Sequence, residues 1–141
     1  MDAPRDFRPL FRTSPALDLI GPLYCRGEGA DLVIGLRVEN KHCNARGTAH
    51  GGMLATLADV ALGYAMAFAS NPPSNLVTAN LTLDFAGTAK IGEWLEAHVD
   101  VQKRGSRLSF ANCYITVNDQ RIVRASAVFL VAGQLDDNAS A

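Results

Sequence analysis

The chain has 141 residues, enough for one domain of ordinary size but not for two. A hydrophobic share of 48% against 19% charged residues excludes an intrinsically disordered protein. With 13 basic and 14 acidic side chains the formal net charge is -1, too little positive charge to hold nucleic acid. We therefore expect a single domain over residues 1–141.

The two ends of the chain are polar and weakly patterned. Residues 1–19 contain several charges and no apolar run, which argues against a secretory signal and predicts a cytoplasmic protein. Residues 1–13 and 134–141 are expected to be flexible. The three cysteines are an odd number without a close pair, which predicts free thiols and no zinc site or other metal centre.

Structural elements begin with a short helix, for which Ser14 is the N-cap and Gly21-Pro22 the end. Strands over residues 23–28 and 32–39 follow, and the tight turn between them predicts a hairpin. A polar loop over residues 40–49 leads to the next element.

A long helix is expected over residues 53–69, opening on His50-Gly51-Gly52 and ended by Asn71-Pro72. Asp59 is its single formally charged residue, so the helix must be buried on most sides. The apolar run is shorter than the roughly 20 residues that a bilayer requires, and we expect no membrane association.

Four strands follow the helix, over residues 76–85, 94–101, 108–117 and 122–131. Alternation in the first strand predicts one apolar and one polar face. The apolar face holds Val77, Ala79, Leu81, Leu83 and Phe85, and the polar face holds Thr78, Asn80, Thr82 and Asp84. Turn-forming residues at 104–106 and 118–120 predict that the last three strands are antiparallel neighbours. The pattern indicates an α+β fold with a curved, mostly antiparallel sheet of about six strands around the helix.

The start of the long helix is a candidate oxyanion site. Its backbone N–H groups lack intrahelical acceptors, and Gly51 would let a ligand carbonyl approach them without meeting a side chain. The alternative is that Gly51-Gly52 only permits a tight passage from loop to helix.

Asp59 is the second candidate, because a carboxylate in an apolar helix must be desolvated, paired or facing a cleft. A structural hydrogen bond to a neighbouring hydroxyl would also explain it. Eight residues of helix separate Gly51 from Asp59 by roughly 12 Å, too far for both to reach one carbonyl. If both serve one reaction, they come from two antiparallel copies of the chain, which predicts a dimer.

Asn44, His50-Gly51-Gly52 and Asp59, followed by strands, resemble the hotdog-fold acyl-CoA thioesterases of the phenylacetate-pathway and thioesterase-superfamily-member-2 type. The resemblance covers residues 14–131. It implies that the chain hydrolyses an acyl-CoA or aryl-acyl-CoA to the free acid and CoA. It also implies a homodimer, with dimers paired into a homotetramer, and no cofactor, since CoA is part of the substrate.

The resemblance also assigns roles. The N–H of Gly51 would polarise the thioester carbonyl, with Gly52 beside it, and Asn44 would help to place the water or the thioester. Asp59 of the partner subunit would be the general base or the nucleophile. By the same likeness Thr78 would position the attacking water. His50 would position the loop or touch the ligand.

Basic residues and the acyl site are less well specified. Lys103, Arg104 and Arg107 surround a turn, with Lys90 in a separate loop, and these four could meet the CoA phosphates. They could equally be solvated charges. A tunnel between subunits that includes Met53, Tyr64 and Phe68 would decide which acyl group is accepted.

Two other functions share the expected fold. A hotdog protein could bind acyl-CoA without hydrolysing it, although a binder has little use for a carboxylate near the thioester. A hydratase or dehydratase would place a catalytic histidine with an acid in other motifs, which the sequence does not contain.

Overall fold

The long apolar helix forms as α2, Gly51–Ala67, in the computed structural model, which describes residues 3–134. It begins two residues before the expected start because His50 caps it and both glycines join the first turn. Its buried side chains are Leu54, Leu57, Ala58, Ala61, Leu62, Tyr64, Ala65, Met66 and Ala67. Many of them are alanines, so the helix can pack closely against the strands that surround it.

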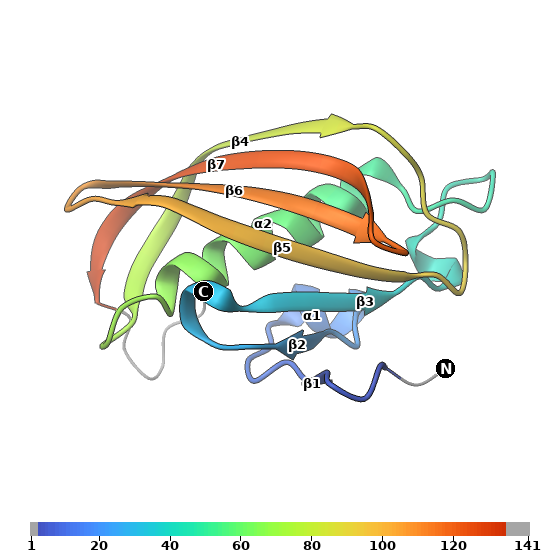
Figure 1. Ribbon diagram of the computed structural model, residues 1–141, viewed down its shortest axis with the longest axis horizontal. Helices are drawn as coiled ribbons and strands as arrows, with labels where there is room; N and C mark the ends of the chain where they lie inside the picture. The colour runs from blue at the N-terminus through green and yellow to red at the C-terminus, as the bar shows by residue number, and fades with distance from the viewer. Residues whose placement is uncertain (1–2, 135–141) are drawn as a thin grey trace.

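Seven strands form one sheet that curves around α2 (Figure 1). Their bounds are Arg8–Pro9 for β1, Tyr24–Arg26 for β2, Val33–Arg37 for β3, Ser74–Phe85 for β4, Trp94–Arg104 for β5, Leu108–Val117 for β6 and Gln120–Gln134 for β7. The order in the sheet is β1-β2-β3-β5-β6-β7-β4, and every neighbouring pair is antiparallel. The expected α+β architecture is confirmed, with the two-residue strand β1 added to the six expected.

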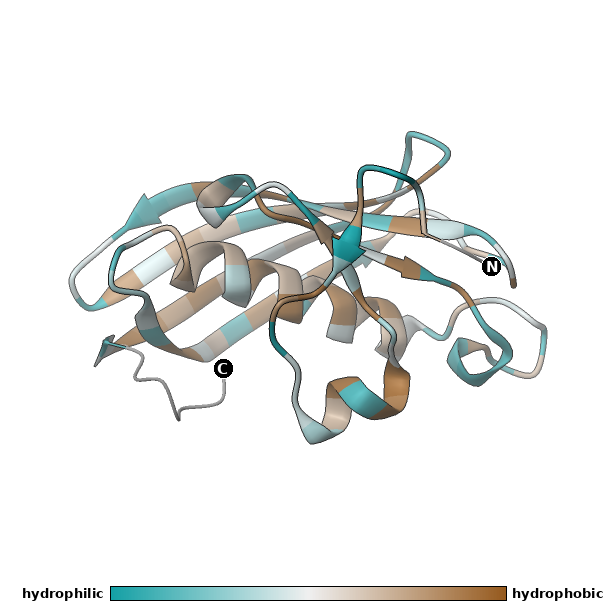
Figure 2. Cartoon of the chain, turned by 90° about the horizontal axis from the view of Figure 1, so that it is seen from below, coloured by the Kyte–Doolittle hydropathy of each residue, from teal (hydrophilic) through white to brown (hydrophobic). Residues whose placement is uncertain are grey.

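Both expected pairings are present. Strands β2 and β3 form the hairpin, with a single turn of 3-10 helix at Gly29–Asp31 between them. The last three strands, β5, β6 and β7, are antiparallel neighbours. The short helix α1 spans Pro15–Ile20, where the Ser14 hydroxyl accepts a hydrogen bond from the N–H of Leu17. Seen from below, α2 runs along the sheet in mainly apolar colours and α1 lies beside it (Figure 2).

Strand β4 contains a β-bulge that the sequence pattern does not reveal. Thr78 pairs with Phe129 of β7, but the next paired residue, Asn80, pairs with Val128. Ala79 is therefore an extra residue without a partner of its own. A one-residue insertion of this kind reverses which side chains face the helix along the rest of the strand.

The predicted faces of β4 are wrong because of this bulge. The alternation placed Thr78 on the face opposite Leu81 and Leu83. In the structure Leu81 and Leu83 pack against the core, while Thr78 borders a cavity beside α2, so all three point to the helix side. Val77, which precedes the bulge and was expected on the same face as Leu81, is 53% exposed. Phe85 follows the bulge and keeps the expected side, since a Cβ at Gly51 of α2 would lie 3.5 Å from its ring.

The described part of the N-terminal segment is packed onto the sheet. Residues 3–13, which we expected to belong to a flexible end, include β1 and the buried Phe7, whose ring centre lies 5.0 Å from that of Trp94. Arg26 of β2 forms an ion pair with Asp6 at 2.8 Å. At the other end β7 continues to Gln134, and residues 135–141 lie outside the described residues. No helix in the described range has the length and apolar character to cross a bilayer.

We predict that Gly35→Ala destabilises the N-terminal half of the sheet. A Cβ at Gly35 would lie 2.2 Å from Cζ2 of Trp94 and 3.0 Å from Cε1 of Phe7, so the aromatic cluster would have to move. We expect a loss of about 1–3 kcal/mol in the free energy of unfolding, measured by urea denaturation.

The control is the same substitution in a Trp94→Leu background. If the Trp94 ring is the cause, Gly35→Ala costs much less there than in the natural chain. An equal loss in both backgrounds would contradict this explanation.

Candidate active site

The start of α2 is held by His50. Its Nδ1 accepts a hydrogen bond from the N–H of Gly52 at 3.2 Å, and its backbone N–H donates to the carbonyl of His42 at 2.8 Å. The N–H of Gly51 has no hydrogen-bond acceptor among the described residues. This N–H, at the positive end of a 17-residue helix, is the group available to a carbonyl oxygen from outside the chain.

Packing within the chain does not explain the two glycines. A Cβ at Gly51 would lie 3.5 Å from the Phe85 ring, and one at Gly52 would lie 3.6 Å from Nδ1 of His50, which are ordinary contacts. Neither glycine has a φ in the left-handed region. The passage from loop to helix could therefore be made by other residues, which weakens the purely structural interpretation of this pair.

Asn44 orders the loop in front of the helix. Its Oδ1 accepts hydrogen bonds from the N–H groups of Arg46 and Thr48, at 2.9 and 3.3 Å. Its Nδ2 donates to the hydroxyl of Thr48 at 3.0 Å. Both polar atoms of the amide thus contribute to the turn that brings the chain to His50 and the helix start.

Asp59 lies about two turns along α2 and meets Thr78 of β4. The Thr78 hydroxyl donates to Oδ1 of Asp59 at 3.0 Å, and no described residue forms an ion pair with this carboxylate. Asp59 is half-buried and Thr78 is exposed. The β-bulge at Ala79 makes this contact possible, because it turns the Thr78 side chain toward the helix.

Asp59 and Thr78 border a cavity of about 260 Å³ between α1, α2 and β4. It is lined by Ser14, Ala16, Leu17, Thr56, Asp59, Val60, Gly63, Tyr64, Ala67, Ser74, Asn75, Leu76, Thr78 and Phe129. Of the three expected tunnel residues, Tyr64 lines it, whereas Met53 and Phe68 do not. The lining residues that α2 contributes, from Thr56 to Ala67, are spaced so that they lie on one face of the helix. This spacing can be recognised in the sequence.

Gly51 and Asp59 do not meet within one chain. Asp59 lines the cavity, but Gly51, Gly52, His50 and Asn44 do not. The predicted residues therefore fall into two groups at different positions along α2. One group surrounds the free N–H of the helix start, and the other is the pair formed by Asp59 and Thr78.

The four basic residues are also divided. Lys90 lies near the helix start, where its backbone bridges to Thr48. Lys103 and Arg104 are the last two residues of β5, and Arg107 lies in the turn that leads to β6. Arg104 shares a surface cavity with Met66 near the other end of α2. None of the four forms an ion pair with a residue in the range 3–134.

In the described part of the chain, no three histidine, cysteine or acidic side chains form a group that could hold a metal ion. His42 is buried, and both its ring nitrogens are engaged, by the N–H of Glu39 at 2.9 Å and the carbonyl of Ile20 at 2.5 Å. Burial raises the pKa of Cys113 to about 12, so this thiol stays protonated at neutral pH.

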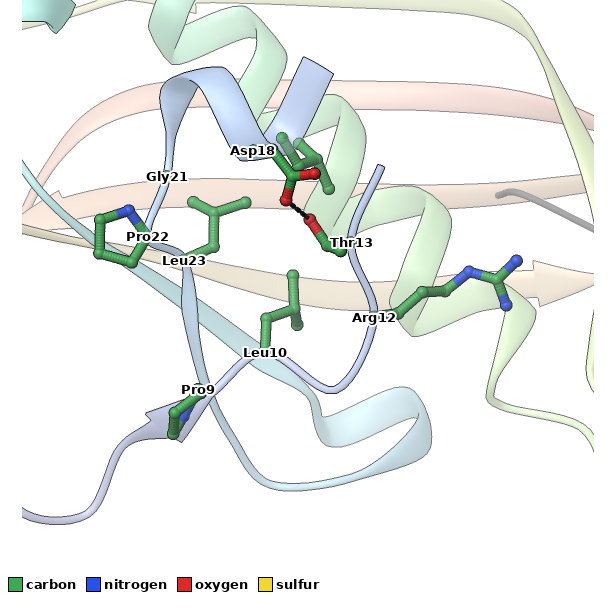
Figure 3. A pocket seen from close by; sticks show the side chains of 9 residues that line it. Pro9, Leu10, Arg12, Thr13, Asp18, Gly21, Pro22 and Leu23 are labelled. Atoms are coloured by element: carbon green, nitrogen blue, oxygen red, sulfur yellow. Dashed lines mark hydrogen bonds between the residues drawn. The ribbon is translucent and has the colours of Figure 1, made fainter. Parts of the chain in front are cut away.

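A second cavity, of about 400 Å³, is lined by α1 and by residues that precede and follow it in the chain (Figure 3). Leu17 lines both cavities. The Thr13 hydroxyl donates to Asp18 at 2.5 Å across its wall, which ties the N-terminal segment to α1. None of the residues predicted to act in a reaction borders this cavity.

Comparison with known proteins gives consistent results. A family model for the thioesterase superfamily matches residues 46–124. A protein of Pseudomonas aeruginosa named as an esterase is 52% identical, over 92% of this chain and 97% of its own length. The mouse acyl-coenzyme A thioesterase 13 is 35% identical, over 60% of this chain and 60% of its own.

Solved structures share the fold. Zebrafish thioesterase superfamily member 2 has a TM-score of 0.76 and 28% identity, covering 84% of this chain and 88% of that one. The PaaI protein from the phenylacetic acid degradation operon of E. coli has a TM-score of 0.78 over 86% of each chain. It is 20% identical, so its likeness concerns the fold alone. The expected hotdog architecture is confirmed.

We predict that Gly51→Pro leaves the fold intact. Position 51 is the first residue of α2, its N–H bonds to no described acceptor, and His50 has a ψ of 137°, as a residue before proline prefers. The free energy of unfolding should change by less than about 1 kcal/mol. Ala55→Pro, one turn further along α2, is the matched control and should cost about 3 kcal/mol or more. Equal losses in the two variants would show that the N–H of Gly51 has a structural partner.

Proposed function

The chain belongs to the thioesterase superfamily and is a thioester hydrolase, and we propose that its substrates are acyl-CoAs, which it cleaves to a free acid and CoA. The observation that carries the proposal is the pairing of two features on one buried helix. A free N–H group at its start can bind the thioester oxygen, and a carboxylate beside a cavity can direct the attack. The acyl-CoA thioesterase 13 likeness supports CoA as the thiol component.

In the proposed reaction the N–H of Gly51 donates a hydrogen bond to the carbonyl oxygen, where negative charge develops as the carbon becomes tetrahedral. Asp59 either takes a proton from the attacking water or attacks the carbonyl carbon itself, with water then releasing the acid. Either route breaks the C–S bond and ends with the acid and the CoA thiol. Thr78, through its hydrogen bond to Oδ1, orients the carboxylate and leaves Oδ2 for the reaction. These groups supply the whole reaction, so we propose that it uses no metal or cofactor.

We propose that each active site contains Gly51 of one subunit and Asp59 of another. The two residues lie roughly 12 Å apart on one straight helix, so a two-fold axis between antiparallel copies of α2 is needed to bring them together. The outer edge of β4 is not paired with any described strand and borders the same cavity, which leaves room for a second copy there.

The same arrangement gives the basic residues a role. In an antiparallel dimer, the end of α2 that lies near Arg104 in one subunit approaches the helix start of the other. We propose that the turn with Lys103, Arg104 and Arg107 and the separate Lys90 together meet the phosphates of CoA. We further propose that such dimers pair into tetramers, as the family resemblance implies.

Asp59→Asn should abolish thioester hydrolysis while leaving the thermal unfolding temperature nearly unchanged, because the amide keeps the shape but cannot act as a base or nucleophile. Turnover is measured as thiol release from a panel of acyl-CoAs. Asp100→Asn, an exposed aspartate on β5, is the control and should retain full activity. Near-normal turnover in Asp59→Asn would exclude this mechanism. A natural chain that binds the panel but releases no thiol would favour the non-catalytic binder.

A mixing experiment tests the shared site. Gly51→Pro removes the proposed oxyanion donor and should lower kcat by about 10²–10³-fold. Gly51→Ala keeps the N–H but adds a side chain where the carbonyl approaches, so it should lower kcat by a smaller factor than Gly51→Pro. When Gly51→Pro and Asp59→Asn chains are unfolded and refolded together, half of the dimers contain one of each. Each such dimer has one intact site of two, so activity should recover to about a quarter of that of the natural protein. Activity no higher than in the separate variants would show that both residues act within one chain.

A further inference from the structure

We propose that His42 is a positioning residue for the hydrolysis, whose buried imidazole fixes the loop that aims the N–H of Gly51 at the thioester oxygen. This inference rests on the proposed function, because it takes that N–H as the oxyanion donor. It adds a residue that does not touch the substrate and acts only through the start of α2. Both residues belong to one chain, so the inference holds whichever subunit supplies Asp59.

His42 is a buried polar ring to which the proposed reaction gives no role. It is 1% exposed, although the loop that follows it is polar and His50, eight residues later, is exposed. Burying such a ring costs free energy unless its nitrogens are hydrogen-bonded. Both nitrogens have partners here, so the ring forms a fixed connection between segments of the chain.

The two ring nitrogens of His42 contact different elements. Nδ1 lies 2.9 Å from the backbone nitrogen of Glu39, and Nε2 lies 2.5 Å from the carbonyl oxygen of Ile20, the last residue of α1. A backbone N–H can only donate and a carbonyl can only accept, so the ring is neutral and carries its proton on Nε2. The N–H of His42 also donates to the carbonyl of Glu39 at 3.0 Å, which closes the 3-10 turn Asn40–His42.

His42 stands at the base of a short hairpin that leads to the start of α2. Opposite it is His50, whose N–H donates to the carbonyl of His42 at 2.8 Å. The next pair in the hairpin is Cys43 with Ala49, joined by an antiparallel bridge. Gly51 follows His50 directly, so the direction of its N–H depends on where the base of the hairpin lies.

An oxyanion donor is sensitive to small displacements of this hairpin. A hydrogen bond weakens steeply as its angle closes, and a misplacement of about 1 Å can lower a rate about a hundredfold. The second arm of the hairpin is held by the bond from the N–H of Ala49 to the carbonyl of Ala89, at 2.7 Å. The first arm is held at its base by the ring of His42. We therefore expect the ring to affect the rate through the position of Gly51.

Two substitutions separate the bonds of the His42 ring. In His42→Asn the side-chain oxygen lies two bonds from Cβ, as Nδ1 does, and can still accept from Glu39. In His42→Gln the side-chain nitrogen lies three bonds from Cβ, as Nε2 does, so it can reach Ile20 but leaves Glu39 without its acceptor. Each variant loses one buried hydrogen bond, and the thermal unfolding temperatures should fall by similar amounts.

The two variants should differ in catalysis. For the acyl-CoA of the panel that the natural chain hydrolyses fastest, kcat should fall about tenfold or more in His42→Gln, where the turn before the hairpin is released. It should fall less than about threefold in His42→Asn, which keeps this turn closed. KM should change by less than about threefold in both, because the donor acts mainly in the transition state.

A double-mutant cycle with Gly51→Pro shows whether the loss passes through the oxyanion donor. The loss of about tenfold from His42→Gln should shrink to less than about twofold in Gly51→Pro, where the N–H is already absent. His98→Gln is the matched control, because His98 lies on β5 and bonds to Glu96, and this variant should keep the natural kcat.

The outcomes distinguish this inference from the proposed function. An equal loss from His42→Gln in both backgrounds, or a natural kcat in that variant, would overturn the role of His42 while leaving thioester hydrolysis intact. Failure of the natural chain to release thiol from any acyl-CoA of the panel would instead count against the proposed function.

Discussion

The burial of α2 is the constraint on which the rest of this structure depends. A 17-residue helix with one formal charge cannot remain in water, and no other described helix is long enough to cover it. The sheet supplies the cover by curving, with β3, β5, β6, β7 and β4 all in contact with the helix. What the sheet leaves uncovered is a strip of α2 beside β4, and this strip contains Asp59. The candidate site thus lies where the sheet ends and no longer covers the helix.

Much of this architecture could be predicted from the sequence. The apolar helix, its ends within two residues, and the antiparallel order of the last three strands follow from periodicity and turn-forming residues, which act locally. The bulge in β4 could not be predicted in this way. Ala79 fits an apolar face and is small enough to be the extra residue, so alternation across it looks continuous. Because one inserted residue reverses the faces of a strand, the alternation placed Thr78 on the side away from the helix, although its hydroxyl contacts Asp59 of α2.

Some features of the candidate site depend on residues that are close in the sequence, and others depend on segments that are far apart in it. Gly51 and Asp59 stand out in the sequence because each departs from what a buried helix needs, one at its end and one in its interior. The cap made by His50 and the turn made by Asn44 depend on side-chain hydrogen bonds within a few residues, and they appear only when the loop is seen in three dimensions. The lining of the cavity joins α1, α2 and β4, segments distant in sequence, so most of it lay beyond sequence reasoning.

The polar groups on α2 also explain why the helix can be both buried and reactive. Asp59 satisfies part of its hydrogen-bonding capacity through Thr78, and it keeps its second oxygen for other uses. Tyr64 packs its ring against Phe11 and Phe68 and so helps to hold the N-terminal segment on the helix. Asp59 therefore joins α2 to β4 with one oxygen and leaves the other without a described partner. Because Asp59 also lines the cavity between α1, α2 and β4, the same side chain contributes to the packing of the helix and to the reaction proposed for it.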